Sequence, residues 1–358
     1  WLWRSGACMS AVRARPESVP RPPPHPPRKE PDMNDDIEPA PRLFTRREAL
    51  AMTAGLGAAA ALGIAPAGAA AASGKPLLTR PIPRTGERLA VVGLGTAIVF
   101  DIGEDAAQRA ERRAVIETLL QGGARLIDTA PSYGAAESVL GDLLADLKVR
   151  DKVFVATKVR AAGRDRAVAE MQQSQRRLRT NKIDLMQIHN VGFVDRNETA
   201  AQLTLLREWK ERGVFRYIGV THSQSQERAN EALIGIMRRE KLDFIQVNYS
   251  MAERSVEQRL LPAAAATGTA VLVNLPFARG RLFRAVRGKP VPGWAGEFEA
   301  STWGQFFLKY ILASEAVNCV IPGTDKPEYM VDNLNAGRGR LPDAAMRRKM
   351  AAFIDSLD

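Results

Sequence analysis

The fold is decided by residues 125–134, which read RLIDTAPSYG, and by the helix-like stretch 136–147 that follows them. The apolar run before Asp128 predicts a short buried strand. The next loop is broken by a proline and a glycine and contains Tyr133. Loops at the carboxyl ends of parallel strands hold the reactive groups of many α/β proteins. Asp128 and Tyr133 are therefore candidate site residues, and a turn-capping Asp beside a packed Tyr is the alternative.

Short apolar runs alternate with amphipathic segments through residues 73–358, which we treat as one domain. The predicted strands are 91–95, 125–128, 153–158, 183–189, 216–221, 243–248, 270–274 and 317–321. The predicted helices are 106–121, 136–147, 164–179, 199–212, 226–239, 255–266, 302–313 and 327–336. Eight such units in about 250 residues predict an α/β fold, the closed (β/α)8 TIM barrel. A doubly wound open sheet is the alternative, but residues 93–98 read GLGTAI and lack the third glycine of a dinucleotide fingerprint.

The composition excludes several classes of protein. Of the 358 residues, 45% are hydrophobic and 25% are charged, as in a globular protein with a sizeable core. The net charge of +11 is spread over many predicted helices, without an Arg-rich stripe with interleaved aromatics, so no nucleic-acid partner is expected. The two cysteines, Cys8 and Cys319, and three histidines predict neither a disulfide framework nor a metal site.

The first 72 residues are not predicted to join the barrel. Residues 1–44 are rich in Pro and Arg and are expected to be a disordered leader, within which Met33 is a candidate for the true start. Residues 45–72 contain Arg46-Arg47, then a weakly hydrophobic run rich in Ala and Gly that ends at Ala70-Ala71-Ala72.

This arrangement resembles a twin-arginine signal peptide. The resemblance implies the twin-arginine export machinery as a partner, a periplasmic or secreted protein, and no permanent membrane span after cleavage. A single transmembrane anchor is the alternative, and the glycines and prolines that interrupt the run disfavour it.

Four ionisable residues are predicted to meet at one end of the barrel. Lys158 ends the third predicted strand and His189 ends the fourth, so both join Asp128 and Tyr133 at the mouth. A nearby ammonium lowers the pKa of a Tyr, which is otherwise about 10, and so suits Tyr133 to proton transfer. Asp128 would keep Lys158 charged, and His189 would hydrogen-bond a carbonyl oxygen. For His189 alone, a partly buried structural His is the alternative. Because no side chain is a reductant, the hydride must come from a cofactor.

The motifs in this order resemble those of the aldo-keto reductase superfamily, over residues 85–336. They are D-T-A-x-x-Y-G at 128–134, T-K at 157–158, D-L-x-x-x-H at 184–189 and I-P-G at 321–323. The resemblance implies an NADP-dependent oxidoreductase that reduces an aldehyde or ketone to an alcohol, or runs the reverse reaction. It implies the catalytic tetrad Asp128, Tyr133, Lys158 and His189, with Tyr133 as the general acid and base.

The resemblance also implies a cofactor-binding set. It comprises the first-strand loop, a pair after the fifth strand, an amide-binding Gln, a turn over the pyrophosphate and a late adenosine segment. Its residues are Gly95, Thr96, Thr221, His222, Gln246, Asn274, Pro276, Phe277, Arg279, Gly280, Gly323, Thr324, Lys326, Asp332 and Asn333. For Gln246, an inward-facing strand residue without a cofactor role is the alternative.

Several positions depart from the family pattern, among them His222, which replaces the common Asn, and Asn190, which stands where many members have an aromatic residue. Asn274 stands where an aromatic residue usually stacks on the nicotinamide, and Tyr329 replaces an Arg that contacts the 2′-phosphate, with Lys326 nearby as a substitute. NADP(H) is the expected cofactor, and NAD(H) is the alternative. The partner is expected to be a small carbonyl or alcohol substrate, selected by loop residues such as 276–300. A non-catalytic, nucleotide-sensing or partner-binding barrel is the rival function. A barrel hydrolase is disfavoured, because the mouth motifs lack a carboxylate pair and metal ligands.

Overall fold

The computed structural model describes residues 74–191, 196–223 and 227–357. The leader predicted for residues 1–44 and the export signal predicted for 45–72 lie outside these residues. All described residues belong to one compact unit. Within the described ranges, no helix is long and apolar enough to cross a membrane.

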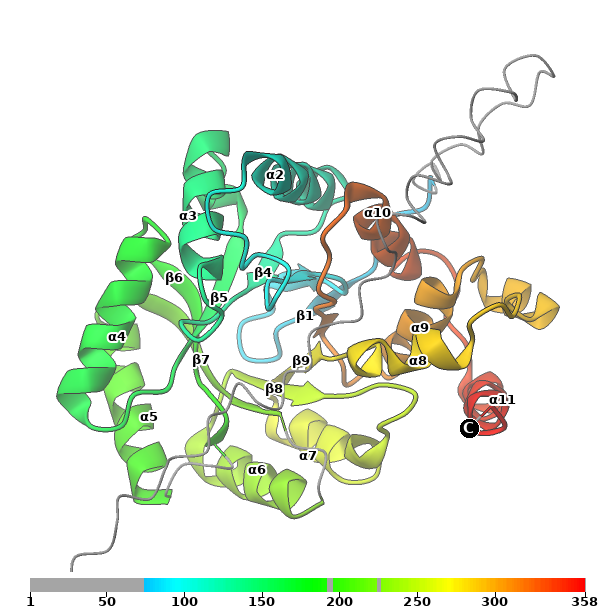
Figure 1. Cartoon of the computed structure of the whole chain (residues 1–358). Coiled ribbons are helices and arrows are strands. Elements are labelled where there is room, and N and C mark those ends of the chain that lie inside the picture. The colour runs from blue at the N-terminus through cyan, green and yellow to red at the C-terminus, as the bar shows by residue number, and fades with distance from the viewer. Residues whose placement is uncertain (1–73, 192–195, 224–226, 358) are drawn as a thin grey trace, which may run out of the picture. The chain divides into compact units, whose positions relative to one another are not determined.

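Eight parallel strands form one sheet in chain order and confirm the predicted (β/α)8 barrel (Figure 1). They are β3 (Leu94–Gly95), β4 (Leu126–Asp128), β5 (Phe154–Val159), β6 (Ile183–Ile188), β7 (Phe215–His222), β8 (Phe244–Asn248), β9 (Ala270–Asn274) and β10 (Cys319–Val320). The barrel is closed between its first and last strands, where Gly93 N donates to Val320 O at 2.8 Å and Gly95 N to Pro322 O at 3.0 Å. A Cβ at Gly95 would lie 2.7 Å from the Ile321 carbonyl oxygen, so glycine is required for this closure.

Helices follow most strands and cover the outside of the barrel (Figure 1). They are α2 (Ala106–Gln121), α3 (Ala136–Leu147), α4 (Arg164–Arg177), α5 (Arg196–Glu211), α6 (Glu227–Glu240), α7 (Leu260–Thr267), α9 (Trp303–Leu312) and α10 (Pro327–Ala336), with the short α8 (Arg281–Ala285) before α9. The helix predicted at 255–266 is broken into a 3-10 turn, Ser255–Glu257, and α7. Pro262 explains the break, because proline is tolerated only in the first turn of a helix and α7 therefore begins just before it.

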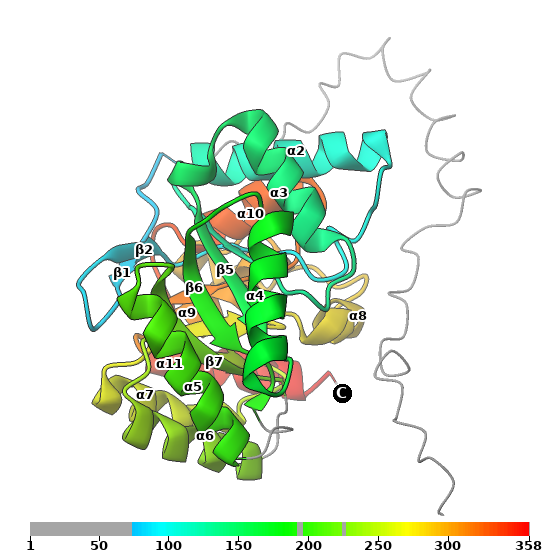
Figure 2. The same ribbon diagram turned by 90° about the vertical axis from the view of Figure 1, so that its left-hand side faces the viewer.

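A β-hairpin closes the amino end of the barrel. It consists of β1 (Thr79–Pro81) and β2 (Arg88–Ala90), and Figure 2 shows it at the opposite end from α8. Ile82 and Leu89 of this hairpin pack inside the barrel against the first residues of several strands, among them Phe154 and Phe244. The carboxyl ends of the strands therefore form the open mouth.

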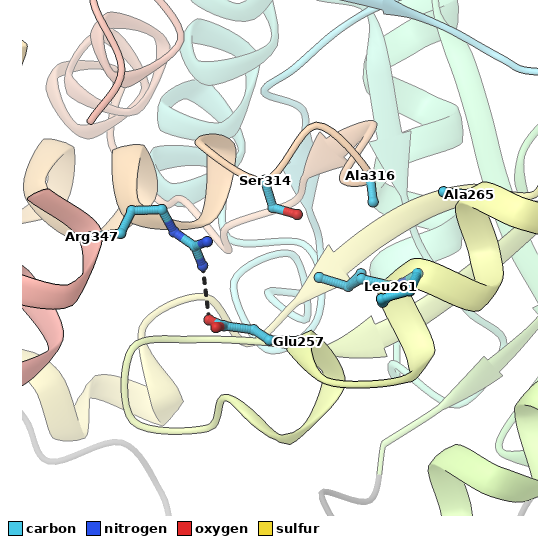
Figure 3. A pocket seen from close by; sticks show the side chains of 7 residues that line it. Glu257, Leu261, Ala265, Ser314, Ala316 and Arg347 are labelled. Atoms are coloured by element: carbon cyan, nitrogen blue, oxygen red, sulfur yellow. Dashed lines mark hydrogen bonds and ion pairs between the residues drawn. The ribbon is translucent and has the colours of Figure 1, made fainter. Parts of the chain in front are cut away.

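Glu257 is one of the residues that tie the C-terminal helix α11 (Ala344–Asp355), which was not predicted from the sequence, to the barrel. Glu257 Oε1 accepts hydrogen bonds from Tyr249 Oη at 2.7 Å, Tyr310 Oη at 2.8 Å and the Arg347 guanidinium at 2.9 Å. Figure 3 shows the Glu257–Arg347 ion pair beside a cavity of about 250 Å³, which Leu261 also lines. One carboxylate thus joins the segment after β8, α9 and α11.

We expect Arg347→Met to lower the free energy of unfolding by about 2 kcal/mol, because Glu257 would lose its cation in a largely buried place. The matched variant Arg348→Met changes an exposed residue of the same helix and should stay within about 0.5 kcal/mol of the wild type. Urea unfolding of both variants measures the difference. Equal losses in the two would show that the cluster does not hold α11.

Candidate active site

A buried ion pair lies at the centre of the mouth. Lys158 Nζ donates to Asp128 Oδ2 at 2.7 Å and to the Thr129 carbonyl oxygen at 2.8 Å. Asp128 Oδ1 accepts from Gln246 Nε2 at 2.9 Å and from Gln187 Nε2 at 3.4 Å. Lys158 is 1% exposed and Asp128 is 3% exposed, and charges so deeply buried are tolerated only when they are paired and hydrogen-bonded. These strand ends therefore form one connected polar network.

Tyr133 and His189 lie against this ion pair. Lys158 Nζ is 4.8 Å from the centroid of the Tyr133 ring, and the Tyr133 and His189 rings meet edge to face with centroids 6.0 Å apart. The loop that holds Tyr133 turns at Gly134, where φ is +56° and a Cβ would clash with the Asp101 carboxylate. The structure therefore brings together all four residues of the predicted tetrad.

Burial controls the protonation of these groups. It raises the pKa of Tyr133, and the opposing charge of Lys158 does not overcome that effect, so the net shift is opposite to the one expected from the sequence. Burial, Lys158 and Arg160 lower the pKa of His189 to about 3, so its imidazole is neutral near pH 7. Burial alone would lower the pKa of Lys158, but Asp128 and Tyr133 raise it overall. At neutral pH the mouth therefore holds a protonated phenol, a neutral imidazole and a charged ammonium.

The residues predicted to surround the adenosine brace the last β-to-α turn. Gly95 pairs with Gly323 where the barrel closes, and Asn333 Nδ2 donates to the buried Thr324 Oγ1 at 3.0 Å. Thr96 is buried directly after β3, and its amide N donates to the Asp128 carbonyl oxygen at 3.0 Å. Asn333 and Thr324 thus fix the turn before α10.

Asp332 is engaged inside the protein. Its carboxylate accepts from Thr302 Oγ1 at 2.9 Å and from Gln305 Nε2 at 2.7 Å, at the start of α9. The sequence predicted a cofactor contact for Asp332, and the structure gives it a role in joining α10 to α9. Lys326 is the N-cap residue of α10 and is exposed, and Tyr329 in the first turn of that helix is 51% exposed.

The residues predicted at the ends of β7 and β8 reach the mouth. Thr221 and His222 are buried at the end of β7, and Thr221 Oγ1 accepts from the Asn190 amide N at 2.9 Å. Asn190 has φ +56°, a left-handed conformation that Asn adopts more readily than most residues. Gln246 donates to Asp128. This bond fits the alternative given above for Gln246, an inward-facing strand residue without a cofactor role.

The turn after β9 contains unusual backbone. Pro276 is buried and Phe277 packs on Phe283, with ring centroids 4.8 Å apart. Arg279 is exposed with φ +52°, and Gly280 with φ +78° precedes α8. Left-handed backbone at a non-glycine residue is strained and is often found beside ligands. The structure thus places an exposed basic residue on a strained turn next to the mouth.

Several buried acceptors at the strand ends fit a ligand that carries N–H donors. Among the described residues, the side-chain oxygens of Asn190, Asn248, Ser250 and Asn274 are buried and have no hydrogen-bond partner. An unmet buried acceptor is costly, so these atoms favour a bound partner, and the two N–H donors of a nicotinamide carboxamide would satisfy two of them. No site role was predicted from the sequence for Asn190, Asn248 or Gln187, although all three lie at or near the last residue of a strand.

A cavity of about 300 Å³ adjoins the tetrad at His189. It is lined by Pro131, Ser132, Arg160, Glu170, Gln173, Arg177 and His189. The cavity in Figure 3, beside α11, contains none of the predicted site residues. In the described part of the chain, no group of three His, Cys, Asp or Glu residues is placed to hold a metal ion.

Comparison with known proteins gives one consistent family. The family model for the aldo/keto reductase family matches residues 91–352. Aldo-keto reductase YhdN of Bacillus subtilis is 32% identical over 217 residues, which cover 56% of this chain and 62% of that protein. Methylglyoxal reductase YeaE of Escherichia coli is 30% identical over 237 residues, or 65% of this chain and 80% of that protein.

Solved structures agree with this result. The crystal structure of an aldo/keto reductase from Klebsiella pneumoniae in complex with NADP and acetate has a TM-score of 0.62 and 25% identity. The alignment covers 75% of this chain and 93% of that one. Since the family model spans most of the described residues, the chain belongs to the aldo/keto reductase family, whose members are NAD(P)-dependent oxidoreductases of carbonyl compounds.

Proposed function

We propose that Tyr133 is the proton donor in an NAD(P)-dependent reduction of an aldehyde or ketone to an alcohol. The observation that carries this proposal is the contact of Tyr133 with both Lys158 and His189 at the mouth. A general acid must hold its proton before the reaction, and the raised pKa of Tyr133 ensures that it does. A bound nicotinamide cofactor supplies the hydride.

The other three residues prepare Tyr133 and the substrate. The Lys158 ammonium stabilises the negative charge that the phenol acquires as its proton leaves, and Asp128 keeps that ammonium charged and fixed. His189 is neutral, so one ring nitrogen is able to donate a hydrogen bond to the carbonyl oxygen. Two of the unpartnered oxygens of Asn190, Asn248 and Asn274 would accept from the carboxamide N–H groups of the cofactor.

Tyr133→Phe should lower kcat by about 100-fold or more, because it removes the proton donor and leaves the packing nearly unchanged. Steady-state assays with a panel of aldehydes and ketones measure this loss, and nucleotide binding should persist. Tyr217→Phe deletes a hydroxyl at the barrel floor, where it contacts Glu87 at 2.6 Å, and should retain kcat. If the wild-type protein binds nucleotide but turns over no carbonyl compound, the non-catalytic barrel is the correct alternative.

We propose that Lys326 contributes to a preference for NADPH, because it is an exposed cation at the N-cap of α10. Fluorescence titration should show tighter binding of NADPH than of NADH, and Lys326→Gln should reduce that preference by about 10-fold. Lys182→Gln alters an exposed lysine before β6 and should leave the preference unchanged. Equal binding of the two nucleotides by the wild type would contradict the assignment.

We also propose that residues 45–72 direct export through the twin-arginine pathway, which the paired arginines and the small residues at 70–72 support. Replacing both Arg46 and Arg47 by Lys should keep the protein in the cytoplasm, and cell fractionation measures this. Arg42→Lys, just outside the pair, is the matched control and should be exported normally. Export of the double variant would refute the proposal.

A further inference from the structure

The loop after β3 contacts the loop that holds Tyr133 through one carboxylate. Asp101 Oδ1 accepts a hydrogen bond from the Ala135 amide N at 2.8 Å. A Cβ on Gly134 would clash with all three atoms of the same carboxylate group, so Asp101 packs directly on the Gly134 backbone. Asp101 therefore contacts both of the residues that follow Tyr133 in the chain.

Tyr133 lies between this contact and an anchor at the other end of its loop. There, the Thr129 amide N donates to the Ala156 carbonyl oxygen of β5 at 2.9 Å. The Tyr133 amide N donates to the Ala130 carbonyl oxygen at 3.1 Å, which is a bond inside the loop itself. The loop is thus fixed to β5 before Tyr133 and to Asp101 after it, and each contact restrains where the Tyr133 ring lies.

The backbone that carries Asp101 is itself tightly held. Ile98 has φ +67°, which is a rare conformation for a β-branched residue and persists only where the surrounding structure imposes it. The buried Arg112 of α2 donates from Nε to the Val99 carbonyl oxygen at 2.5 Å and from a terminal nitrogen to the Asp325 carbonyl oxygen at 2.6 Å. Asp101 is exposed, but it is attached to a fixed turn that α2 and the segment before α10 hold in place.

We infer that Asp101 is a positioning residue, which holds the Tyr133 loop so that the Tyr133 hydroxyl meets the substrate carbonyl. The inference rests on the proposed function, in which Tyr133 is the proton donor. Asp101 acts through the backbone of Gly134 and Ala135, so its effect should fall on the chemical step and spare the binding of nucleotide and substrate. Proton transfer requires the two heavy atoms to come within about 2.6–3.2 Å, and a displacement of about 1 Å is therefore enough to slow it greatly.

The test measures single-turnover oxidation of bound NADPH by stopped flow, with the aldehyde of the panel that the wild type reduces fastest. This rate reports the chemical step without product release. Asp101→Ala removes the acceptor for the Ala135 amide and should lower the rate about 10-fold, while Kd for NADPH and KM for the aldehyde stay within about 3-fold of the wild type. Asp101→Asn keeps an acceptor oxygen in the same place without the charge, and should keep the rate within about 3-fold.

Asp105→Ala is the matched control. Asp105 is also exposed, and its Oδ1 caps α2 by accepting from the Gln108 amide N at 3.0 Å. Each alanine variant loses one carboxylate that accepts from a backbone N–H at the start of a helix, so each should lower Tm by about 2–4 °C. Only Asp101→Ala should slow the chemical step.

Two results would overturn the inference alone. One is an Asp101→Ala enzyme that is as fast as Asp105→Ala, and the other is an Asp101→Asn enzyme that is as slow as Asp101→Ala. A wild type that binds NADPH but reduces no compound of the carbonyl panel would instead refute the proposed function, and the inference with it.

Discussion

The ion pair between Lys158 and Asp128 constrains the rest of the barrel. Two charges with exposures of 1% and 3% carry a large desolvation cost, which only close hydrogen bonds offset. Those bonds come from Thr129 after β4, Gln187 on β6 and Gln246 on β8, and Lys158 itself lies on β5. Four strands must therefore hold their register for the pair to exist. The apolar core packs the barrel, and this polar network fixes how the strand ends meet.

The same pair determines what the mouth can do. An ammonium that is held close to Tyr133 and His189 disfavours a charged imidazole and stabilises a phenolate, while burial favours the neutral form of both rings. The result is a phenol that keeps its proton until a neighbouring oxygen develops negative charge. A site of this kind is prepared for reduction before the substrate arrives, because none of its groups has to change protonation first.

Much of the fold was predictable because most strands and helices carry a local pattern. The bounds predicted for α2, β9 and α10 match the structure to the residue. The β1–β2 hairpin was missed because its strands have three residues each and include Pro81. Helix α11 was missed because its attachment depends on contacts between residues far apart in the sequence, such as Arg347 with Glu257 and Asp355 with Arg254, which no local pattern records.

The candidate site was also predictable in part, because several of its residues lie at strand ends. Residues at strand ends stand out against apolar runs, which identified Lys158 and His189 as neighbours before the structure placed them together. The direction of the Tyr133 pKa shift was not predictable, because it depends on how deeply the ring is buried. The hydrogen bonds of Asp332 were not predictable either. They join α10 to Thr302 and Gln305 at the start of α9, and no sequence motif relates these two helices.

The position of a side chain along β5 decides how tightly it is held. In β5, Lys158 is the last buried residue of the inward row and needs every one of its partners, so substitutions there disturb the whole network. Arg160, two residues further along the chain, is exposed at the rim of the mouth. The charge that prepares Tyr133 is thus fixed by buried contacts and not by the exposed rim of the mouth.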